Sequence, residues 1–353
     1  MIIKSHFKDY EVDIKDDFEF INELKEMKNS IFAIDRNVYE IYKDKLFSDI
    51  NKEKIYLIDA LEEKKNIETA LEICEKFTQM SAKRNALLIS IGGGIVQDVT
   101  GFVANILYRG INWILVPTTL LSACDSCIGS KTSLNYKNYK NLLGTFYPPD
   151  KLYICSKFFN TLTDTDFNSG LGEVIKFNVM AGTEGIKLIE ENLESLMKRE
   201  ANHLNEFVNR SLNFKIPFIE KDEFDKGDRI YLNFAHTFGH AFETVSKYKI
   251  PHGLAVALGM LVANRISVIR GIFEKEIAER IERVCKKILT IDIKEEWFDI
   301  NLVVDAIRKD KKQTSDSLTA VLLYDDFNIG IFNNITEEEL SESFSHVKEI
   351  IIK

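Results

Sequence analysis

Hydrophobic and polar positions follow two different rhythms along the first 150 residues. Short runs rich in β-branched and aromatic residues, at Ser30–Ile34, Ile55–Ile58 and Ala86–Ile91, predict strands. The longer segments Val38–Phe47 and Asn66–Met80 place apolar residues at helical spacing. Strands that alternate with helices are typical of a parallel sheet joined by crossover helices. The first half of the chain therefore predicts an α/β domain.

The second half has helical periodicity almost throughout. Beyond about residue 165, apolar residues recur at helical spacing through Phe167–Met180, Gly185–Met197, Phe207–Phe218, Leu232–Val245 and Leu254–Arg270. Tyr147-Pro148-Pro149 marks the region of the change, because neither a helix nor a central strand tolerates two prolines. We predict two domains, an α/β domain at 1–160 and a mainly helical domain at 161–353.

Composition narrows the class of protein. The chain has 353 residues and 45% hydrophobic content, which exceeds the size at which one core stops growing. A formal charge of −9 gives no electrostatic reason to expect binding to nucleic acid or to an anionic membrane. An odd number of cysteines, five, and no apolar signal stretch indicate a reduced, cytoplasmic setting. No run of about 18 apolar residues occurs, so we predict no membrane-spanning helix.

A glycine-rich turn follows the predicted strand that ends at Ile91. Gly92–Gly94 come next, and Ile95–Ala104 has helical spacing. At such a turn the backbone can approach a pyrophosphate closely, and the helix N-terminus favours its negative charge. The strict G-x-G-x-x-G pattern fails, because Gln97 occupies the third glycine position. The turn indicates either a dinucleotide site or an ordinary strand-to-helix turn.

Histidines and acidic residues in the second half suggest a metal site. His236 and His240 are four residues apart and share one face of the predicted helix, and His252 follows Pro251 shortly afterwards. Imidazole and carboxylate are ligands that zinc prefers, and Glu173 lies in the preceding helical segment. The alternative is that these histidines form hydrogen bonds inside the core.

Glu173 and Lys176 are three residues apart and share a helix face. Their neighbours Leu171, Val174 and Ile175 are apolar, so we expect at least one of the two charges to face a partner in a cleft. A solvated ion pair is the alternative.

Residues 117–148 combine hydroxyls, glycines, Lys131, Lys140 and Asn141. Fixed cations and amide donors after a strand suit a phosphate ester, whereas a charged surface loop would have the same composition. Cys124 and Cys127 form a single C-x-x-C, and because no second one accompanies it, we expect two reduced, packed thiols.

Eight motifs, in order and at these separations, resemble dehydroquinate synthase and the related sugar-phosphate cyclases over nearly the whole chain. They are Gly92–Phe102, Tyr108–Gly110, Pro117–Ser122, Asp125–Thr132, Lys140–Gly144, Glu173–Lys176, Asn233–Ala241 and His252–Met260. The resemblance implies an α/β fold with a Rossmann-like N-terminal domain that binds NAD and a mainly helical C-terminal domain that supplies metal ligands. It also implies a homodimer.

The resemblance implies that Glu173, His236 and His252 hold a divalent metal, zinc or cobalt, with His240 beside the substrate phosphate. The other residues implied to meet the substrate fall into three groups. They are Lys131, Asn141, Asn233 and Arg109 at the phosphate, with Lys311 and Lys312 closing over it; Asp125 and Lys176 at the ring hydroxyls; and Lys215 and Arg229 at the carboxylate. Arg109 could come from the neighbouring subunit.

The resemblance also implies a set of residues for NAD. They are Gly93, Gly94 and Asp98 at the dinucleotide turn, Thr118 and Thr119 beyond it, Asp35 and Asn37 on the ribose side, and Glu62, Lys65 and Lys140. The implied reaction converts 3-deoxy-D-arabino-heptulosonate 7-phosphate into 3-dehydroquinate and phosphate, and returns the NAD to its starting state.

The sequence departs from the family pattern at Gln97, Ser130, Tyr136 and Leu254, the first two of which replace glycines. These departures leave other substrates open. The alternatives are amino-dehydroquinate synthase, 2-deoxy-scyllo-inosose synthase, a sedoheptulose 7-phosphate cyclase, and a metal-dependent alcohol or glycerol dehydrogenase. Two retained cations, Lys215 and Arg229, favour a substrate with a carboxylate, because burying both without an anion would be costly.

Overall fold

The computed structural model describes residues 1–80, 83–137, 139–309 and 318–352, which form two compact units. Unit 1 comprises Met1–Thr161 and Ile216–Phe224, and unit 2 comprises Leu162–Lys215 and Asp225–Lys353. The first change of unit falls beside the predicted boundary. The return of 216–224 to unit 1 was not part of the prediction, although Pro217, a proline inside a helix, stands at the start of this segment.

Unit 1 is built on a seven-stranded sheet in the order β1-β2-β9-β6-β5-β3-β4. Its strands are β1 (Ile2–Ile3), β2 (Tyr10–Lys15), β3 (Ser30–Asp35), β4 (Ile55–Ile58), β5 (Leu87–Gly92), β6 (Asn112–Pro117) and β9 (Lys151–Cys155). All neighbours are parallel except β1 and β2, which confirms the predicted α/β class. The carboxyl ends of β3, β5 and β6 therefore meet at one edge of the sheet.

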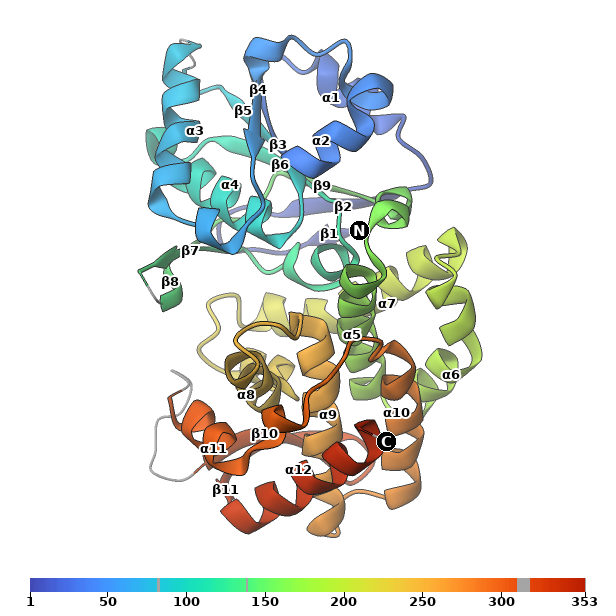
Figure 1. The fold of residues 1–353 in the computed structure, drawn as a ribbon. Coiled ribbons are helices and arrows are strands. Elements are labelled where there is room, and N and C mark those ends of the chain that lie inside the picture. The colour runs from blue at the N-terminus through green and yellow to red at the C-terminus, as the bar shows by residue number, and fades with distance from the viewer. Residues whose placement is uncertain (81–82, 138, 310–317, 353) are drawn as a thin grey trace. The chain divides into compact units, whose positions relative to one another are not determined.

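Helices cover both faces of this sheet. In Figure 1, α1 (Phe20–Glu26) and α2 (Arg36–Tyr42) lie on one side of the strands, and α3 (Ile67–Gln79) and α4 (Gly94–Ile106) lie on the other. The apolar positions of α3 explain its orientation, because Ala70, Ile73 and Phe77 recur at helical spacing and are fully buried.

The segment that we predicted as a polar loop contains a hairpin. Strands β7 (Lys131–Tyr136) and β8 (Tyr139–Phe146) pair antiparallel outside the main sheet. The two prolines then lead into β9 and so lie inside unit 1, which corrects the idea that they mark the domain change. They sit between strands, where no ladder hydrogen bond is needed, and the Pro148 carbonyl accepts from Trp113 Nε1 at 2.9 Å.

Unit 2 is mainly helical, as predicted. Its helices are α5 (Asp164–Met180), α6 (Thr183–Met197), most of α7 (Ala201–Lys221), α8 (His236–Val245), α9 (His252–Ile269), α10 (Lys275–Ile288), α11 (Ile300–Arg308) and α12 (Glu337–Ile351). A two-stranded hairpin of β10 (Leu318–Tyr324) and β11 (Asn328–Ile335) completes it.

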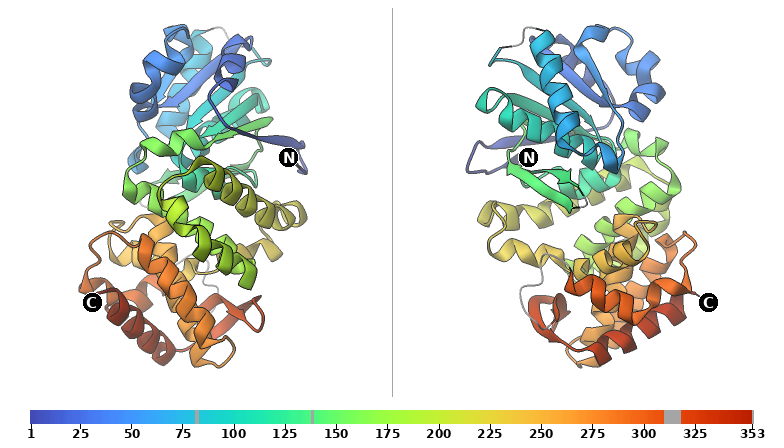
Figure 2. Two further views of the ribbon diagram at one scale, coloured as in Figure 1. Left: turned by 90° about the vertical axis from the view of Figure 1, so that its right-hand side faces the viewer. Right: turned by 60° about the vertical axis from the view of Figure 1, so that its left-hand side comes forward.

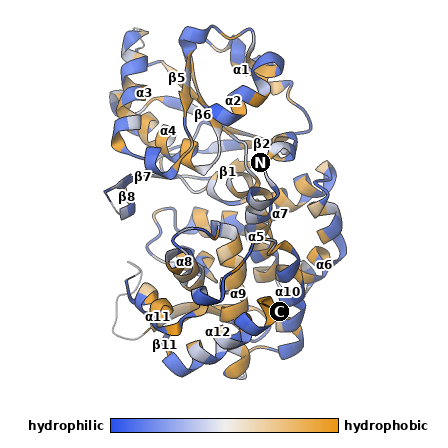
Figure 3. Cartoon of the chain, in the orientation of Figure 1, coloured by the Kyte–Doolittle hydropathy of each residue, from blue (hydrophilic) through white to orange (hydrophobic). Residues whose placement is uncertain are grey.

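Helix α9 is the centre of unit 2. Helices α5, α8, α10 and α12 pack around it, and Figure 2 shows this bundle from two further sides. Figure 3 shows that α9 is hydrophobic along most of its length. By length and composition alone it is a candidate membrane span, but 78% of that span is buried inside the protein. Its burial is that of a core helix, and no other described helix passes the same test.

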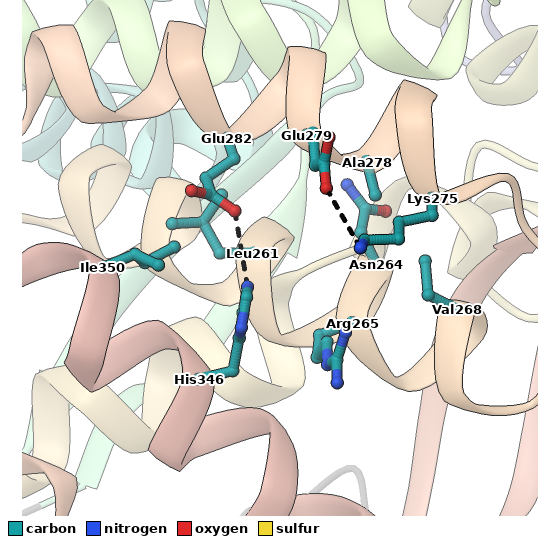
Figure 4. A pocket seen from close by; sticks show the side chains of 10 residues that line it. All are labelled: Leu261, Asn264, Arg265, Val268, Lys275, Ala278, Glu279, Glu282, His346 and Ile350. Atoms are coloured by element: carbon teal, nitrogen blue, oxygen red, sulfur yellow. Dashed lines mark hydrogen bonds and ion pairs between the residues drawn. The ribbon is translucent and has the colours of Figure 1, made fainter.

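Figure 4 shows a small pocket lined by α9, α10 and α12. Two ion pairs line it, Glu282–His346 at 3.4 Å and Lys275–Glu279 at 3.5 Å. The side-chain amide of Asn264 is 2% exposed and has no hydrogen-bond partner among the described residues. The pocket volume of about 30 Å³ suits about two water molecules, which would satisfy this amide.

Arg270 joins the end of α9 to the start of α12. Its guanidinium donates to both carboxylate oxygens of Glu339, at 2.6 and 2.8 Å, and to the backbone carbonyl of Asn334 at 2.9 Å. The Glu339 carboxylate also accepts from the Thr336 backbone N–H, which completes a capping box at the start of α12. Both side chains of the ion pair are only about one-sixth exposed, 15% and 16%. One carboxylate therefore fixes the helix start and the packing of α12.

We predict that Glu339→Gln lowers the free energy of unfolding of unit 2 by about 2 kcal/mol at pH 7, because it removes a charge-assisted pair. The pKa of Glu339 is lowered, chiefly by the hydrogen bond from Arg270. Its stabilisation is thus complete above the ordinary value of 4.5 and is lost as pH falls through the lowered folded pKa. The difference between wild type and variant should shrink below about pH 4.

Urea unfolding in a Trp113→Phe background would test this, because Trp297 then remains as the tryptophan that reports on unit 2. The matched control is Glu342→Gln, which breaks the exposed pair with Arg265 and should cost less than about 0.5 kcal/mol. Equal effects of the two variants would contradict the assignment.

Candidate metal and cofactor sites

Glycines bring the candidate metal ligands together by allowing α5 and α9 to touch. A methyl group on Gly172 would lie 2.0 Å from the Gly253 carbonyl oxygen, and one on Gly253 would lie 1.7 Å from the Ser169 carbonyl oxygen. Any larger side chain at either position would push the helices apart. Glu173 follows one glycine and His252 precedes the other, so this backbone contact sets their side chains beside each other.

Glu173, His236 and His252 converge on one point in unit 2. Glu173 Oε1 lies 3.5 Å from His236 Nε2 and 3.4 Å from His252 Nε2. Their candidate ligand atoms all lie within 4.8 Å of one another. A divalent metal at about 2.0–2.2 Å from each atom fits such a group, and three protein ligands leave a position open for substrate.

The chemistry of Glu173 also fits a cation. The residue is 0% exposed, and neither carboxylate oxygen accepts a well-aligned hydrogen bond among the described residues. Lys176 Nζ lies 2.6 Å from Oε2. Burial alone would raise the pKa of Glu173, but Lys176 and His252 outweigh it and lower the pKa to about 2. Glu173 is therefore a buried carboxylate that needs positive charge around it.

Both histidine rings are oriented by an oxygen atom close to Nδ1. His236 Nδ1 lies 3.0 Å from the Phe234 carbonyl oxygen, to which it can donate, and His252 Nδ1 lies 3.4 Å from Glu243 Oε1. These contacts turn both Nε2 atoms toward Glu173, as partners of metal-bound histidines do. Glu243 was not among the predicted site residues. Its only signal in the sequence is that it lies one helical turn beyond His240.

His240 lies next to the three ligands. Its ring centroid is 5.5 Å from that of His236 and 6.0 Å from that of His252. His240, Glu243 and His252 also have candidate ligand atoms within 4.8 Å of one another. The described residues thus offer two overlapping groups that share His252.

The predicted NAD residues of unit 1 gather at the carboxyl edge of the sheet. Asp35 caps α2 and accepts from Asn37 N at 2.8 Å. Gly93 precedes α4, and the neighbouring strand continues into Thr118, whose N–H donates to the Gly92 carbonyl at 3.0 Å. Gly94 and Thr119 follow directly in the two segments. Backbone N–H groups at the start of α4 suit a pyrophosphate.

Lys65 is the centre of a polar cluster in unit 1. Its Nζ lies 2.5 Å from Asp98 Oδ2 and donates to Asn141 Oδ1 at 2.6 Å. Glu62 lies 3.7 Å from Lys140 Nζ. Residues predicted separately for NAD and for phosphate thus form one cluster.

Two neighbours of this cluster were missed. The Ser133 hydroxyl contacts Asp98 and Asn141 at 3.0 and 2.9 Å, and Asn135 donates to Glu62 Oε1 at 2.8 Å. Both belong to β7 and are two residues apart, so they point to the same face. Alternation along a strand would have found them, but the segment was predicted as a loop.

The hydrogen bonds of Gln97 explain why a glutamine can occupy the third glycine position of the turn. It is buried on α4, donates to the Ser126 carbonyl at 2.6 Å, and accepts from the hydroxyls of Ser126 and Ser122 at 3.0 and 3.2 Å. The amide thus ties the helix of the glycine turn to the short π-helix Ser122–Ser126, which carries Asp125.

The remaining predicted residues lie in separate places. In unit 1, Lys131 is the exposed first residue of β7, and Arg109 is exposed on a turn with positive φ. In unit 2, Lys215 and Arg229 are buried, and Asn233 ends the short helix Asp228–Asn233. Lys311 and Lys312 lie outside the described residues. The five cysteines are free thiols, as expected for Cys124 and Cys127.

Comparisons with known proteins show the family to which this chain belongs. Models of the 3-dehydroquinate synthase N-terminal and C-terminal regions match residues 55–169 and 170–313. A 3-dehydroquinate synthase from Clostridium tetani (strain Massachusetts / E88) is 40% identical over 319 residues, which cover 90% of this chain and 85% of the relative.

Solved structures show the same fold. The crystal structure of 2-deoxy-scyllo-inosose synthase complexed with carbaglucose-6-phosphate, NAD+ and Co2+ has a TM-score of 0.86 at 22% identity, covering 98% of this chain and 99% of that one. A probable glycerol dehydrogenase from Sinorhizobium meliloti 1021 has a TM-score of 0.61 at 14% identity, with 97% of each chain covered. The fold is thus that of the sugar-phosphate cyclases and of related dehydrogenases. Within this class, the chain belongs to the 3-dehydroquinate synthase family.

We predict that Glu173→Gln removes tightly bound metal, because an amide is a much poorer ligand than a carboxylate. His240→Gln should retain the metal, because His240 stands outside the group that contains Glu173. Dialysis of zinc-loaded protein followed by elemental analysis would measure both, with circular dichroism to show that each variant folds. The reverse pattern would place the metal in the group with His240 and Glu243. His252→Ala should lose metal in either case, since both groups share His252.

Proposed function

We propose that the protein is an NAD- and divalent-metal-dependent cyclase that converts 3-deoxy-D-arabino-heptulosonate 7-phosphate into 3-dehydroquinate and phosphate. The match to 3-dehydroquinate synthases along most of the chain supports this reaction. The observation that carries it is the convergence of Glu173, His236 and His252 on one point in unit 2. These three side chains would hold zinc or cobalt, which when bound would lower the pKa of a substrate hydroxyl and so favour its oxidation by NAD.

Lys176 would work beside the metal. Its ammonium is held by Glu173 Oε2 at 2.6 Å and by the Leu232 carbonyl at 3.2 Å. Held between two acceptors, it has a fixed orientation and can donate to a ring hydroxyl without reorganising. Asn233 and His240 are the nearby candidates for the phosphate that leaves.

The NAD would lie on unit 1. Gly93 and Gly94 would meet the pyrophosphate, Thr118 and Thr119 would lie alongside, and Asp35 would meet a ribose. The polar cluster of Glu62, Lys65, Asp98 and Lys140 would contact the cofactor, and Asn141 would reach toward the phosphate of the substrate.

Positively charged side chains favour a substrate that carries both a carboxylate and a phosphate. Lys215 and Arg229 are both buried in unit 2 and match the family positions for a substrate carboxylate. Lys131, Asn141 and Arg109 in unit 1 match positions for the phosphate. A simple alcohol has neither the carboxylate nor the phosphate that these positions would bind, which argues against an alcohol or glycerol dehydrogenase.

We further propose that the protein is a cytoplasmic homodimer in which Arg109 reaches the phosphate of the neighbouring subunit. Arg109 is exposed in the single chain, and Tyr108, Arg109 and Gly110 all have positive φ. A turn held in this conformation at the surface suits a residue that serves a partner.

We predict that zinc- or cobalt-loaded protein with NAD and the heptulosonate phosphate releases phosphate and forms 3-dehydroquinate without net NADH. Phosphate release, mass spectrometry of the product and absorbance at the NADH band would be measured together. Sedoheptulose 7-phosphate and glucose 6-phosphate serve as matched controls without a carboxylate and should react at least about 100-fold more slowly. Accumulation of NADH with glycerol or another simple alcohol would instead identify a dehydrogenase.

A further inference from the structure

The turn before Lys131 has an unusual backbone. Gly129 and Ser130 have φ values of 99° and 63° in succession. Glycine adopts positive φ freely, whereas serine does so at a cost in free energy. The resemblance to the sugar-phosphate cyclases implies glycine at both positions. A serine at 130 therefore needs a compensating contact if it is to hold this turn.

Glu223 supplies that contact within unit 1. The Ser130 hydroxyl donates to Glu223 Oε1 at 2.5 Å, and the Ser130 carbonyl accepts from Tyr147 N at 2.6 Å. Gly129 N donates to the Tyr10 hydroxyl at 3.0 Å. The turn is thus fixed both by side-chain and by backbone hydrogen bonds. Lys131 follows it directly.

The buried Glu223 carboxylate accepts hydrogen bonds from several donors. It is 3% exposed and also accepts from the Ser5 hydroxyl and from His6 N, each at 2.7 Å. His6 Nδ1 lies 3.1 Å from Oε2. Burial would raise the pKa of Glu223, but the hydrogen bonds from Ser130, His6 N and Ser5 outweigh it and lower the pKa. The group is therefore an anion at neutral pH, which strengthens each bond.

Phe224 packs against Phe146 on β8, the strand opposite Lys131. Its ring lies 5.3 Å from Phe146, 6.1 Å from Phe7 and 5.2 Å from the ring of His6. Phe146 pairs with Lys131 in the register of β7 and β8. Glu223 thus holds the residue before Lys131, and Phe224 holds the residue opposite it.

These two residues end the segment Ile216–Phe224, which returns to unit 1 between stretches of unit 2. The stretches on either side carry Lys215 and Arg229, the predicted carboxylate cations. The segment between them is therefore secured on the turn that carries the predicted phosphate cation.

We propose that Glu223 is a positioning residue that fixes the backbone of Lys131 for the phosphate of the substrate, through the hydroxyl of Ser130. This rests on the proposed function, since Lys131 has this task only in a sugar-phosphate cyclase. The serine replaces the conformational freedom of glycine with a specific hydrogen bond to a buried anion.

Steady-state kinetics of Ser130→Gly, Glu223→Gln and Ser5→Ala would test this. Ser130→Gly allows the same φ and removes the CH2OH side chain with its hydrogen bond to Glu223, so KM for the heptulosonate phosphate should rise roughly tenfold, with kcat changed much less. Glu223→Gln should shift KM in the same direction. Ser5→Ala is the matched control, because it removes another donor to the same carboxylate oxygen, away from Lys131, and should leave KM unchanged. An unchanged KM in Ser130→Gly, or an equal shift in Ser5→Ala, would overturn the proposal.

Hydrogen exchange separates this proposal from the proposed function. Backbone amides of 128–134 should exchange faster in Glu223→Gln than in wild type, and at wild-type rates in Ser5→Ala, whether or not the protein makes dehydroquinate. If wild type makes no dehydroquinate, the proposed function fails while exchange still tests the positioning. Unchanged exchange in Glu223→Gln contradicts the positioning role even in an active enzyme. Should Glu223→Gln not fold, the KM of Ser130→Gly decides alone.

Discussion

The buried carboxylate of Glu173 is the constraint on which the candidate active site depends. An ionised group without contact to water must be surrounded by positive charge or by donors, and here Lys176 and two imidazoles stand around it. This requirement explains why α5, α8 and α9 contribute one group each to the same point. It also explains the glycines at 172 and 253, because the helices can bring Glu173 and His252 together only by backbone contact.

The two units contain different kinds of secondary structure, and each kind suits a different ligand. Parallel strands of unit 1 end at one edge, where glycine backbone and helix N-termini suit the phosphates of a dinucleotide. Long helices of unit 2 project side chains at fixed spacing, which suits metal ligands. The polar cluster around Lys65 shows how unit 1 organises its own charges, since a single ammonium bridges Asp98 and Asn141. Each unit therefore prepares its part of the reaction with contacts made inside that unit.

Much of this could be predicted from the sequence, and the omissions have physical reasons. Strand and helix periods located β3, β4 and β5, helix α3 and the helices from α5 to α9, because apolar positions recur at the period of each element. Strands β1, β2 and β9 and helices α10 to α12 were not among the predicted segments. The hairpin of β7 and β8 was taken for a loop, because polar side chains dominate it, and Ser133 and Asn135 were missed with it. Strand β10 is buried at most positions, so it lacks the alternation that marks a strand. Glu223 acts through a contact with Ser130, 93 residues away in the sequence, which no local pattern contains. Glu243 acts through a contact with His252 on the next helix, and its spacing from His240 was its only signal.

We propose that Glu173, His236 and His252 share one metal ion. Anomalous diffraction from crystals of the zinc-loaded protein, recorded on both sides of the zinc edge, tests it most directly. We expect one ion within about 2.0–2.2 Å of a Glu173 oxygen and of Nε2 of both histidines. An ion bound instead by His240 and Glu243, with Glu173 paired only to Lys176, would contradict it.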